Sequence, residues 1–185
     1  MASLELIANT EGRLCTLAKV YVLMNVWIVY DSKYGNNKLI AEALAGYFKD
    51  GNIVHVHHAK EISQQAVIDG GVDLLLLGGP LRWATPSATM KNWAKKMGSM
   101  LNQKAVKVRK VAIWGTHMKD PPNAPPKLTW EAAKQKWKAI LDTIPAEKKA
   151  PDIQGFIIGP VAGRDTLDAG WQDIVPGFAD TVKNL

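Results

Sequence analysis

The sequence is poor in cysteine. Cys15 is the only cysteine in the chain, so no disulfide can form within it and no metal site can be built on two cysteine ligands. Chains with so little cysteine are typical of reducing compartments. We therefore expect a cytoplasmic protein.

A long apolar run is also missing. The most apolar stretch, residues 14–30, is interrupted by Lys19 and Asn25 and falls short of the roughly 20 apolar residues that a membrane-spanning helix needs. Glu5 and Glu11 lie where a signal peptide would carry its basic residues. We expect no membrane span and no signal peptide, and we interpret residues 14–30 as two strands in succession.

Three signatures of familiar sites do not occur. The sequence contains no G-x-x-x-x-G-K-[ST] loop, no G-x-G-x-x-G loop and no G-x-S-x-G turn. The formal net charge is +6, but the basic residues are scattered and are not interleaved with aromatic ones. Nucleic acid is therefore not a predicted partner, whereas the charge favours an acidic partner or a phosphate-bearing ligand.

The composition, with 47% hydrophobic and 22% charged residues, is typical of a soluble globular protein. We divide the chain into an N-terminal extension, residues 1–24, and a domain of residues 25–185. In the extension, alternating apolar residues flank the turn sequence Asn9–Gly12 and predict a β-hairpin. A two-stranded unit is marginal alone, so we expect it to pack on another surface or to support a homodimer.

The domain alternates apolar runs with helical periodicity. Five runs predict strands at Val26–Tyr30, Asn52–His58, Asp73–Gly79, Val111–Gly115 and Gly155–Gly159. Apolar stripes at helical spacing follow the first, third, fourth and fifth runs, and Pro176 lies in the last stripe. This alternation predicts an α/β domain in which helices cover both faces of a five-stranded parallel sheet.

Ligands of open parallel sheets bind beyond the carboxyl ends of the strands, so the turns there are the candidate site. The first turn, residues 31–38, offers backbone N–H groups at a helix start, with Gly35 at its centre. Ser32 and Asn37 add short polar side chains. This pattern favours an anion such as phosphate, although an ordinary helix cap explains it too.

The second and third turns offer a surface for a planar ring. Residues 78–87 contain two glycines, which we expect to let a ligand approach the backbone, and Trp83, which lies outside any helical stripe and is free to stack. Residues 115–120 contain His117, the only histidine in these three turns. His55 and His57 share one side of the second strand, but without an evident third ligand we predict an edge strand and no metal site.

Together the turns resemble those of the flavodoxin family. Val-Trp-Ile-Val-Tyr-Asp-Ser-Lys-Tyr-Gly-Asn-Asn (26–37) looks like the family's phosphate loop, which commonly reads hydroxyl-x-hydroxyl-Gly-Asn-Thr. Leu-Leu-Leu-Leu-Gly-Gly-Pro-Leu-Arg-Trp-Ala-Thr-Pro-Ser (74–87) looks like its second flavin loop. The resemblance covers residues 26–185 and implies a flavodoxin-like three-layer sandwich with strand order 2-1-3-4-5.

The resemblance also implies flavin mononucleotide (FMN) as the cofactor. The function that follows is electron transfer of the flavodoxin type or flavin-dependent quinone reduction, with a redox protein or a small-molecule acceptor as partner. The cofactor-binding residues that it implies are Ser32, Lys33, Tyr34, Gly35, Asn36, Asn37, Gly79, Pro80, Leu81, Arg82, Trp83, Gly115, Thr116 and His117.

The sequence departs from the family pattern at a few positions. Asn37 stands where threonine is usual, Tyr34 replaces a hydroxyl residue of the first loop, and Gly79 replaces a common serine. Electron-carrier flavodoxins are typically acidic, whereas this chain is basic. These departures leave open an alternative function, a flavodoxin-like binding or interaction module that has lost the flavin.

Overall fold

A computed structural model describes residues 4–8, 14–18, 23–159 and 166–185. β1 (Leu4–Ala8) and β2 (Leu14–Ala18) pair antiparallel, with Leu4 opposite Ala18. The turn expected between them lies outside the described residues. The division of the chain at residue 24 stays a prediction.

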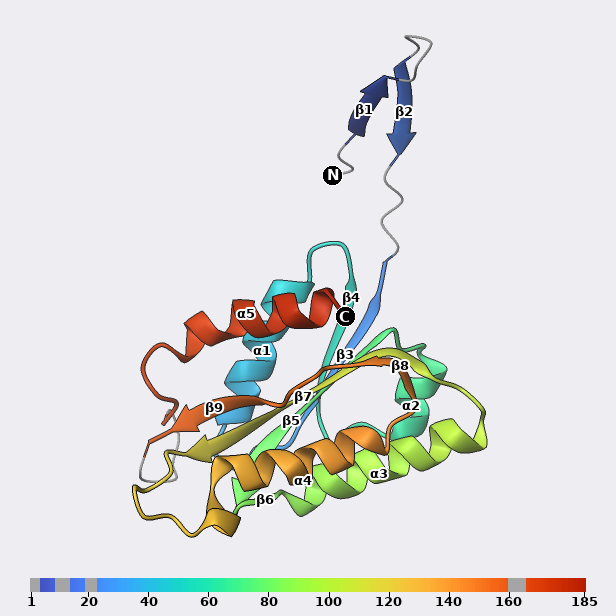
Figure 1. The fold of residues 1–185 in the computed structure, drawn as a ribbon. Helices are drawn as coiled ribbons and strands as arrows, with labels where there is room; N and C mark the ends of the chain where they lie inside the picture. Colours follow the sequence, from blue (N-terminus) through green and yellow to red (C-terminus); the bar gives the residue numbers. More distant parts are fainter. Residues whose placement is uncertain (1–3, 9–13, 19–22, 160–165) are drawn as a thin grey trace.

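The centre of the molecule is a parallel sheet (Figure 1). β3 (Asn25–Tyr30) lies between β4 (Ile53–His58) and β5 (Leu74–Arg82), and β7 (Val108–Met118) pairs with the other edge of β5. Residues 26–29 and 74–77 are fully or almost fully buried, because helices cover both faces of these strands. Their uninterrupted apolar runs are typical of central parallel strands.

The predicted order of strands is confirmed, but the count of five is wrong. Within the described residues, the sheet has seven strands in the order β4-β3-β5-β7-β8, with β6 on β5 and β9 on β7. β8 (Ala146–Lys149) and β9 (Gln154–Ile158) both pair in parallel with β7 and together fill the fifth position. The break between them contains Pro151, which has no N–H for the ladder. β6 (Thr85–Pro86) is a short antiparallel partner of the end of β5.

Helices form the two outer layers. Figure 1 shows α1 (Asn36–Phe48) and α5 (Trp171–Lys183) on one face of the sheet, and α3 (Ala88–Gln103) and α4 (Trp130–Asp142) on the other. α2 (Gln64–Asp69) joins the second layer, and a 3₁₀ turn, η1 (Pro126–Leu128), precedes α4. No helix in the described part of the chain has the length and apolarity needed to cross a membrane.

The predicted apolar stripes form two cores, one on each side of the sheet. Met90, Trp93, Met97 and Leu101 of α3 are all buried, as their spacing predicts. Pro176 lies inside α5. The helix layers do not cover the carboxyl ends of β3, β5 and β7. The three loops identified in the sequence come together there.

Candidate functional site

Two adjoining pockets open at the carboxyl ends of the strands. The first, of about 270 Å³, is lined by Ser32, Lys33, Tyr34, Asn36, Asn37, Pro80, Leu81, Arg82, Thr116 and Ile158. The second, of about 350 Å³, is lined by Leu81, Trp83, Ala84, His117, Met118, Lys119, Asp120, Pro121, Leu128, Thr129, Trp130 and Ile158. Leu81 and Ile158 line both pockets, so one elongated ligand can extend from the first into the second.

The first loop is closed by its own serine. The backbone N–H of Gly35 donates to Ser32 Oγ over 3.0 Å, and Gly35 adopts φ +97°, a conformation that side chains rarely tolerate. The N–H of Asp31 donates to the carbonyl of Gly78 over 2.8 Å, which ties the start of the loop to β5. The loop therefore has a defined shape before any ligand arrives.

α1 begins in this loop, and no side chain among the described residues caps its positive end. α2, α3 and α4 start with a serine or threonine that accepts a backbone N–H, and α5 has Asp173 in its first turn. α1 has neither a side-chain cap nor an acidic residue there. Among the described residues, the N–H groups of Asn37 and Lys38 have no acceptor. Such a helix start favours an anion.

Asn37 points inward and contributes to the wall of the pocket. Its Oδ1 accepts from Trp114 Nε1 over 2.9 Å, and its Nδ2 donates to Thr116 Oγ1 over 3.0 Å. All three residues are buried. Asn37 therefore uses both ends of its amide within the fold. It joins the start of α1 to β7, and one N–H of Nδ2 is left beyond the bond to Thr116.

A buried acid lies beneath the loop, and sequence reasoning did not select it as a site residue. Asp31 is 4% exposed, its Oδ1 lies 3.5 Å from His58 Nε2, and its Oδ2 has no partner among the described atoms. The N–H of Lys60 donates to His58 Nδ1 over 3.1 Å. The N–H of Ser32 lies 3.4 Å from His58 Nε2, so a backbone donor faces each ring nitrogen. His58 thus connects the start of the loop to the segment that follows β4.

Trp83 stands at the tip of a two-residue hairpin turn between β5 and β6. Trp83 and Ala84 have φ +52° and +50°, and the Trp83 side chain is 92% exposed. Lys136 holds the turn by donating to the carbonyl of Ala84 over 2.7 Å. Left-handed backbone at residues with side chains costs of order 1–3 kcal/mol each and gathers at functional positions. An exposed indole on such a turn favours contact with a ligand.

A stacked pair of rings also lines the second pocket. His117 and Trp130 lie 4.2 Å apart and 6° from parallel, and the ring nitrogen Nδ1 of His117 is 2.9 Å from the carbonyl of Met118. Gly155 makes room for both rings, because a Cβ there would lie 2.9 Å from each. The sequence predicted Trp130 only as part of a helical stripe, whereas its place directly after the helix cap Thr129 puts it at the site.

The glycines of the second and third loops have a different role from the expected one. A Cβ on Gly78 would lie 1.8 Å from the buried ring of Trp114, and one on Gly115 would lie 2.7 Å from Trp137. These glycines make room for core tryptophans and not for a ligand. Gly35, Gly79 and Gly115 do not line either pocket. Ile158, at the end of β9, was missed because the sequence offers no polar signal there.

The histidines of the edge strand stack and do not converge. The ring centroid of His55 lies 4.0 Å from that of Trp27 and 6.5 Å from that of His57, and the three rings are near parallel. Within the described residues there is no group of three or more His, Cys, Asp or Glu side chains that could hold a metal ion.

Acid is expected to destabilise the protein through His117. Burial lowers the pKa of His117 below 6.5, while the Met118 carbonyl and Asp120 act in the opposite direction. The unfolded chain therefore takes up this proton first, and stability is lost as the pH falls from 6.5 towards the lower folded value. Urea unfolding at about pH 7 and about pH 5 measures that loss, which His117→Phe should reduce. An equal loss in the variant would contradict the assignment.

No family model matches the sequence, and no curated protein is detectably similar to it. Solved structures do match. A short-chain flavodoxin associated with a non-canonical PDU bacterial microcompartment superposes with a TM-score of 0.63 at 9% identity, over 88% of this chain and 98% of its own. The fold is flavodoxin-like.

Two further structures support that assignment. Oxidised flavodoxin 2 from Bacillus cereus has a TM-score of 0.58 and 16% identity, over 86% of this chain and 98% of its own. Rubredoxin oxygen:oxidoreductase from Desulfovibrio gigas has a TM-score of 0.63 and 13% identity over 86% of this chain. This chain spans about a third of that enzyme, 35% of its length. The flavodoxin-like fold places the two pockets where the sheet ends.

Proposed function

We propose that this chain binds FMN across the two pockets and uses it in electron transfer. The observation that carries the proposal is the open start of α1, which faces a pocket whose lining includes Lys33 and Arg82. Both side chains are cationic and at least partly exposed. Backbone donors, a helix dipole and two cations together suit a dianionic phosphate.

The second pocket suits the ring of the same ligand. Trp83 and the stacked pair of His117 and Trp130 line it, and the apolar side chains of Leu81 and Ile158 line both pockets. Flat aromatic side chains of this kind bind planar rings by stacking. When bound, FMN would supply the redox chemistry, while the protein orients the ring and sets the charge around it.

The proposal includes two kinds of electron acceptor. Either a redox protein that docks at the open pocket or a small planar molecule such as a quinone is compatible with it. We propose that residues 4–22 take no part in the cofactor site and contribute to packing or to self-association.

A second candidate function is a binding module that has lost the flavin. It is favoured by the inward orientation of Asn37, which leaves fewer side-chain donors at the pocket than the family pattern supplies. The visible absorbance of freshly purified protein separates the two candidates. Bands of a bound flavin support the redox function, and their absence even after incubation with FMN supports the module.

Ser32→Ala is expected to weaken FMN binding by about 1–2 kcal/mol, or roughly 5- to 30-fold. The change removes a hydroxyl from the first pocket and leaves the Gly35 N–H without its acceptor. Ser63→Ala is a matched control, because Ser63 caps α2 with the same kind of bond. Calorimetric titration should show weaker FMN binding only for Ser32→Ala. Equal affinities of the two variants would argue against a phosphate at this loop.

Arg82→Glu is expected to lower the reduction potential of the bound flavin. Reduction adds negative charge, which a cation in the lining of the first pocket stabilises and a carboxylate destabilises. Lys107→Glu makes the same change of charge just before β7, at the end of the sheet away from the pockets. Redox titration at low salt should show the larger shift for Arg82→Glu. An unchanged or raised potential would remove Arg82 from the account.

A further inference from the structure

The middle of the chain carries positive charge without any acid. No aspartate or glutamate occurs between Asp73 and Asp120. The cations in the same stretch are Arg82, Lys91, Lys95, Lys96, Lys104, Lys107, Arg109, Lys110 and Lys119. Six of these nine cations lie in β5, α3 and β7, and Lys104, Lys107 and Lys119 lie directly after α3 or on either side of β7.

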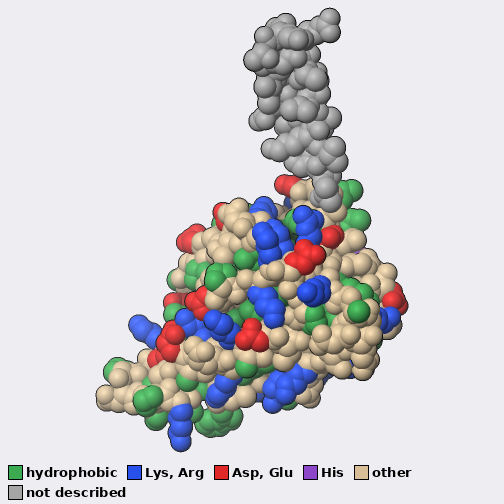
Figure 2. Space-filling model, turned by 45° about the vertical axis from the view of Figure 1, so that its right-hand side comes forward, with side chains coloured by type: hydrophobic (Ala, Val, Ile, Leu, Met, Phe, Trp, Pro, Cys, Tyr) green, Lys and Arg blue, Asp and Glu red, His purple; other side chains and the backbone are tan. Residues whose placement is uncertain are grey.

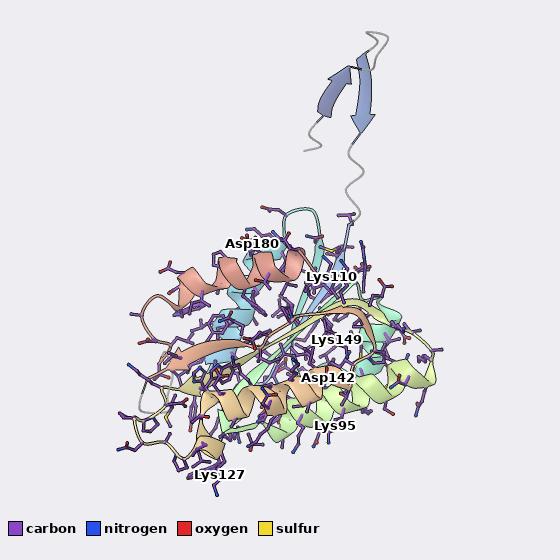
Figure 3. All side chains as sticks on the ribbon, in the orientation of Figure 1. Lys95, Lys110, Lys127, Asp142, Lys149 and Asp180 are labelled. Atoms are coloured by element: carbon purple, nitrogen blue, oxygen red, sulfur yellow. The ribbon has the colours of Figure 1, made fainter. Side chains whose placement is uncertain are left out.

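α3 presents this charge to solvent. Lys95 and Lys96 are exposed and Lys91 is partly so, and we call these three residues the α3 lysine face. None of the three forms an ion pair within the described residues. Lys95 projects from the outer side of the helix in Figure 3. The lower edge of the face seen in Figure 2 shows blue side chains and no red ones.

Neighbouring acids do not neutralise this face. Glu131 and Asp142 of α4 pair with Lys134 and Lys149, at 3.0 and 3.9 Å. Lys91 and Lys95 are four residues apart on one helix, a spacing at which like charges repel. The helix tolerates that repulsion because its opposite face is buried in the core. Uncompensated charge of one sign favours a partner of the other sign.

α3 begins near the mouth of the pockets. α3 starts one residue after β6, directly beyond the turn that carries Trp83, and Ser87 caps it. Arg82 lines the first pocket and Lys119 the second. A partner resting on the α3 lysine face would therefore lie beside the exposed indole of Trp83 and the open pocket.

We propose that the α3 lysine face, together with Arg82 and Lys119, docks an acidic electron-transfer protein. The proposal rests on the proposed function, because the redox character of the partner follows from the flavin, while its acidity follows from the surface. Positive charge around the pocket would steer such a partner and orient its own redox centre towards the site.

Two other anionic partners fit the surface less well. A membrane-binding helix inserts apolar side chains, but Met90, Trp93 and Met97 of α3 are buried in the core. The exposed positions nearest to these lysines on the helix, Asn92 and Ser99, are polar. The outer face of the helix has no aromatic residue for base stacking, because Trp93 points inward. Both partners remain measurable outcomes of the test.

The test uses the full chain, loaded with FMN, and two haem proteins of opposite charge. Acidic cytochrome b5 and basic cytochrome c are titrated at low and high salt, and binding is followed calorimetrically. The variant Lys95→Glu/Lys96→Glu reverses the centre of the face. The control Lys49→Glu/Lys183→Glu makes the same change of charge at exposed positions following α1 and ending α5, in the other helix layer.

We expect the wild type to bind the acidic protein in preference to the basic one, and salt to weaken that binding. The α3 variant should bind about tenfold more weakly or worse, and the control should stay within about twofold of wild type. Equal weakening in both variants, or no preference for the acidic protein, would overturn the proposal. Tighter binding to duplex DNA or to anionic vesicles, abolished by the α3 variant, would also overturn it.

A parallel FMN titration of the wild type and the two double variants distinguishes the docking proposal from the proposed FMN-binding function. Neither pair of lysines lines the pockets, so FMN affinity should be equal in all three. Salt-sensitive binding of the acidic protein without FMN binding would refute the redox function and the redox character of the partner together. FMN binding without a response to Lys95→Glu/Lys96→Glu would refute the docking surface alone.

Discussion

Trp114→Ala is expected to lower the free energy of unfolding by about 3–5 kcal/mol, the cost of deleting a fully buried indole. Trp114 is completely buried in the core beneath α1 and α5. The change also removes the donor to Asn37 Oδ1, which is buried as well. Denaturant unfolding monitored by circular dichroism measures the loss.

Trp114→Phe separates the effect of losing the hydrogen bond to Asn37 from the effect of losing side-chain volume. It keeps most of the ring but leaves the Asn37 oxygen unpaired, which costs about 1–3 kcal/mol. Trp137→Phe is the matched control, since Trp137 is equally buried and its Nε1 has no partner among the described atoms. Trp114→Phe should therefore destabilise more, and it alone should weaken FMN binding. Equal effects of the two variants would show that the bond between Trp114 and Asn37 does not support the site.

Trp83→Ala is expected to reduce FMN affinity by about 10- to 100-fold, the scale of one lost stacking contact of about 1–3 kcal/mol. The side chain is 92% exposed, so the free energy of unfolding should hardly change. Trp83→Phe should retain part of the affinity, because it retains a smaller ring.

Riboflavin, which has the flavin ring but no phosphate, shows whether the lost affinity comes from contacts with the ring or with the phosphate. Trp83→Ala should weaken riboflavin and FMN by the same factor, because both carry the same ring. A stacked indole should also quench flavin fluorescence, and the alanine variant should recover it. Quenching that persists in Trp83→Ala, or an unchanged affinity, would place the ring elsewhere.

The sequence predicted the central sheet well because its strands are buried on both sides. Residues 26–30 and 74–77 are continuous apolar runs, and burial by two helix layers is the condition that selects such runs. β8 was missed because its sequence, Ala-Glu-Lys-Lys, has no apolar pattern and depends on its neighbour β7 for pairing. α2 has six residues, too few to establish a periodicity.

The site was predicted at the level of loops, but less well at the level of side chains. The strand order alone brings Ser32, Arg82 and His117 to one end of the sheet. The inward turn of Asn37 depends on Trp114, which lies far away in the sequence, and could not be inferred from its own loop. The roles of Ile158 and Trp130 likewise follow from packing, because apolar residues in a strand or helix give no local signal of a site.

The most direct test of the account is a calorimetric titration of the flavin-free full chain with FMN and with riboflavin. The open start of α1 and the two cations of the first pocket recognise the phosphate, through charge-assisted hydrogen bonds worth about 1.5–3 kcal/mol each. We predict one FMN per chain and a riboflavin affinity at least about 100-fold weaker. Equal affinity for the two flavins, or no binding of FMN, would contradict the central claim.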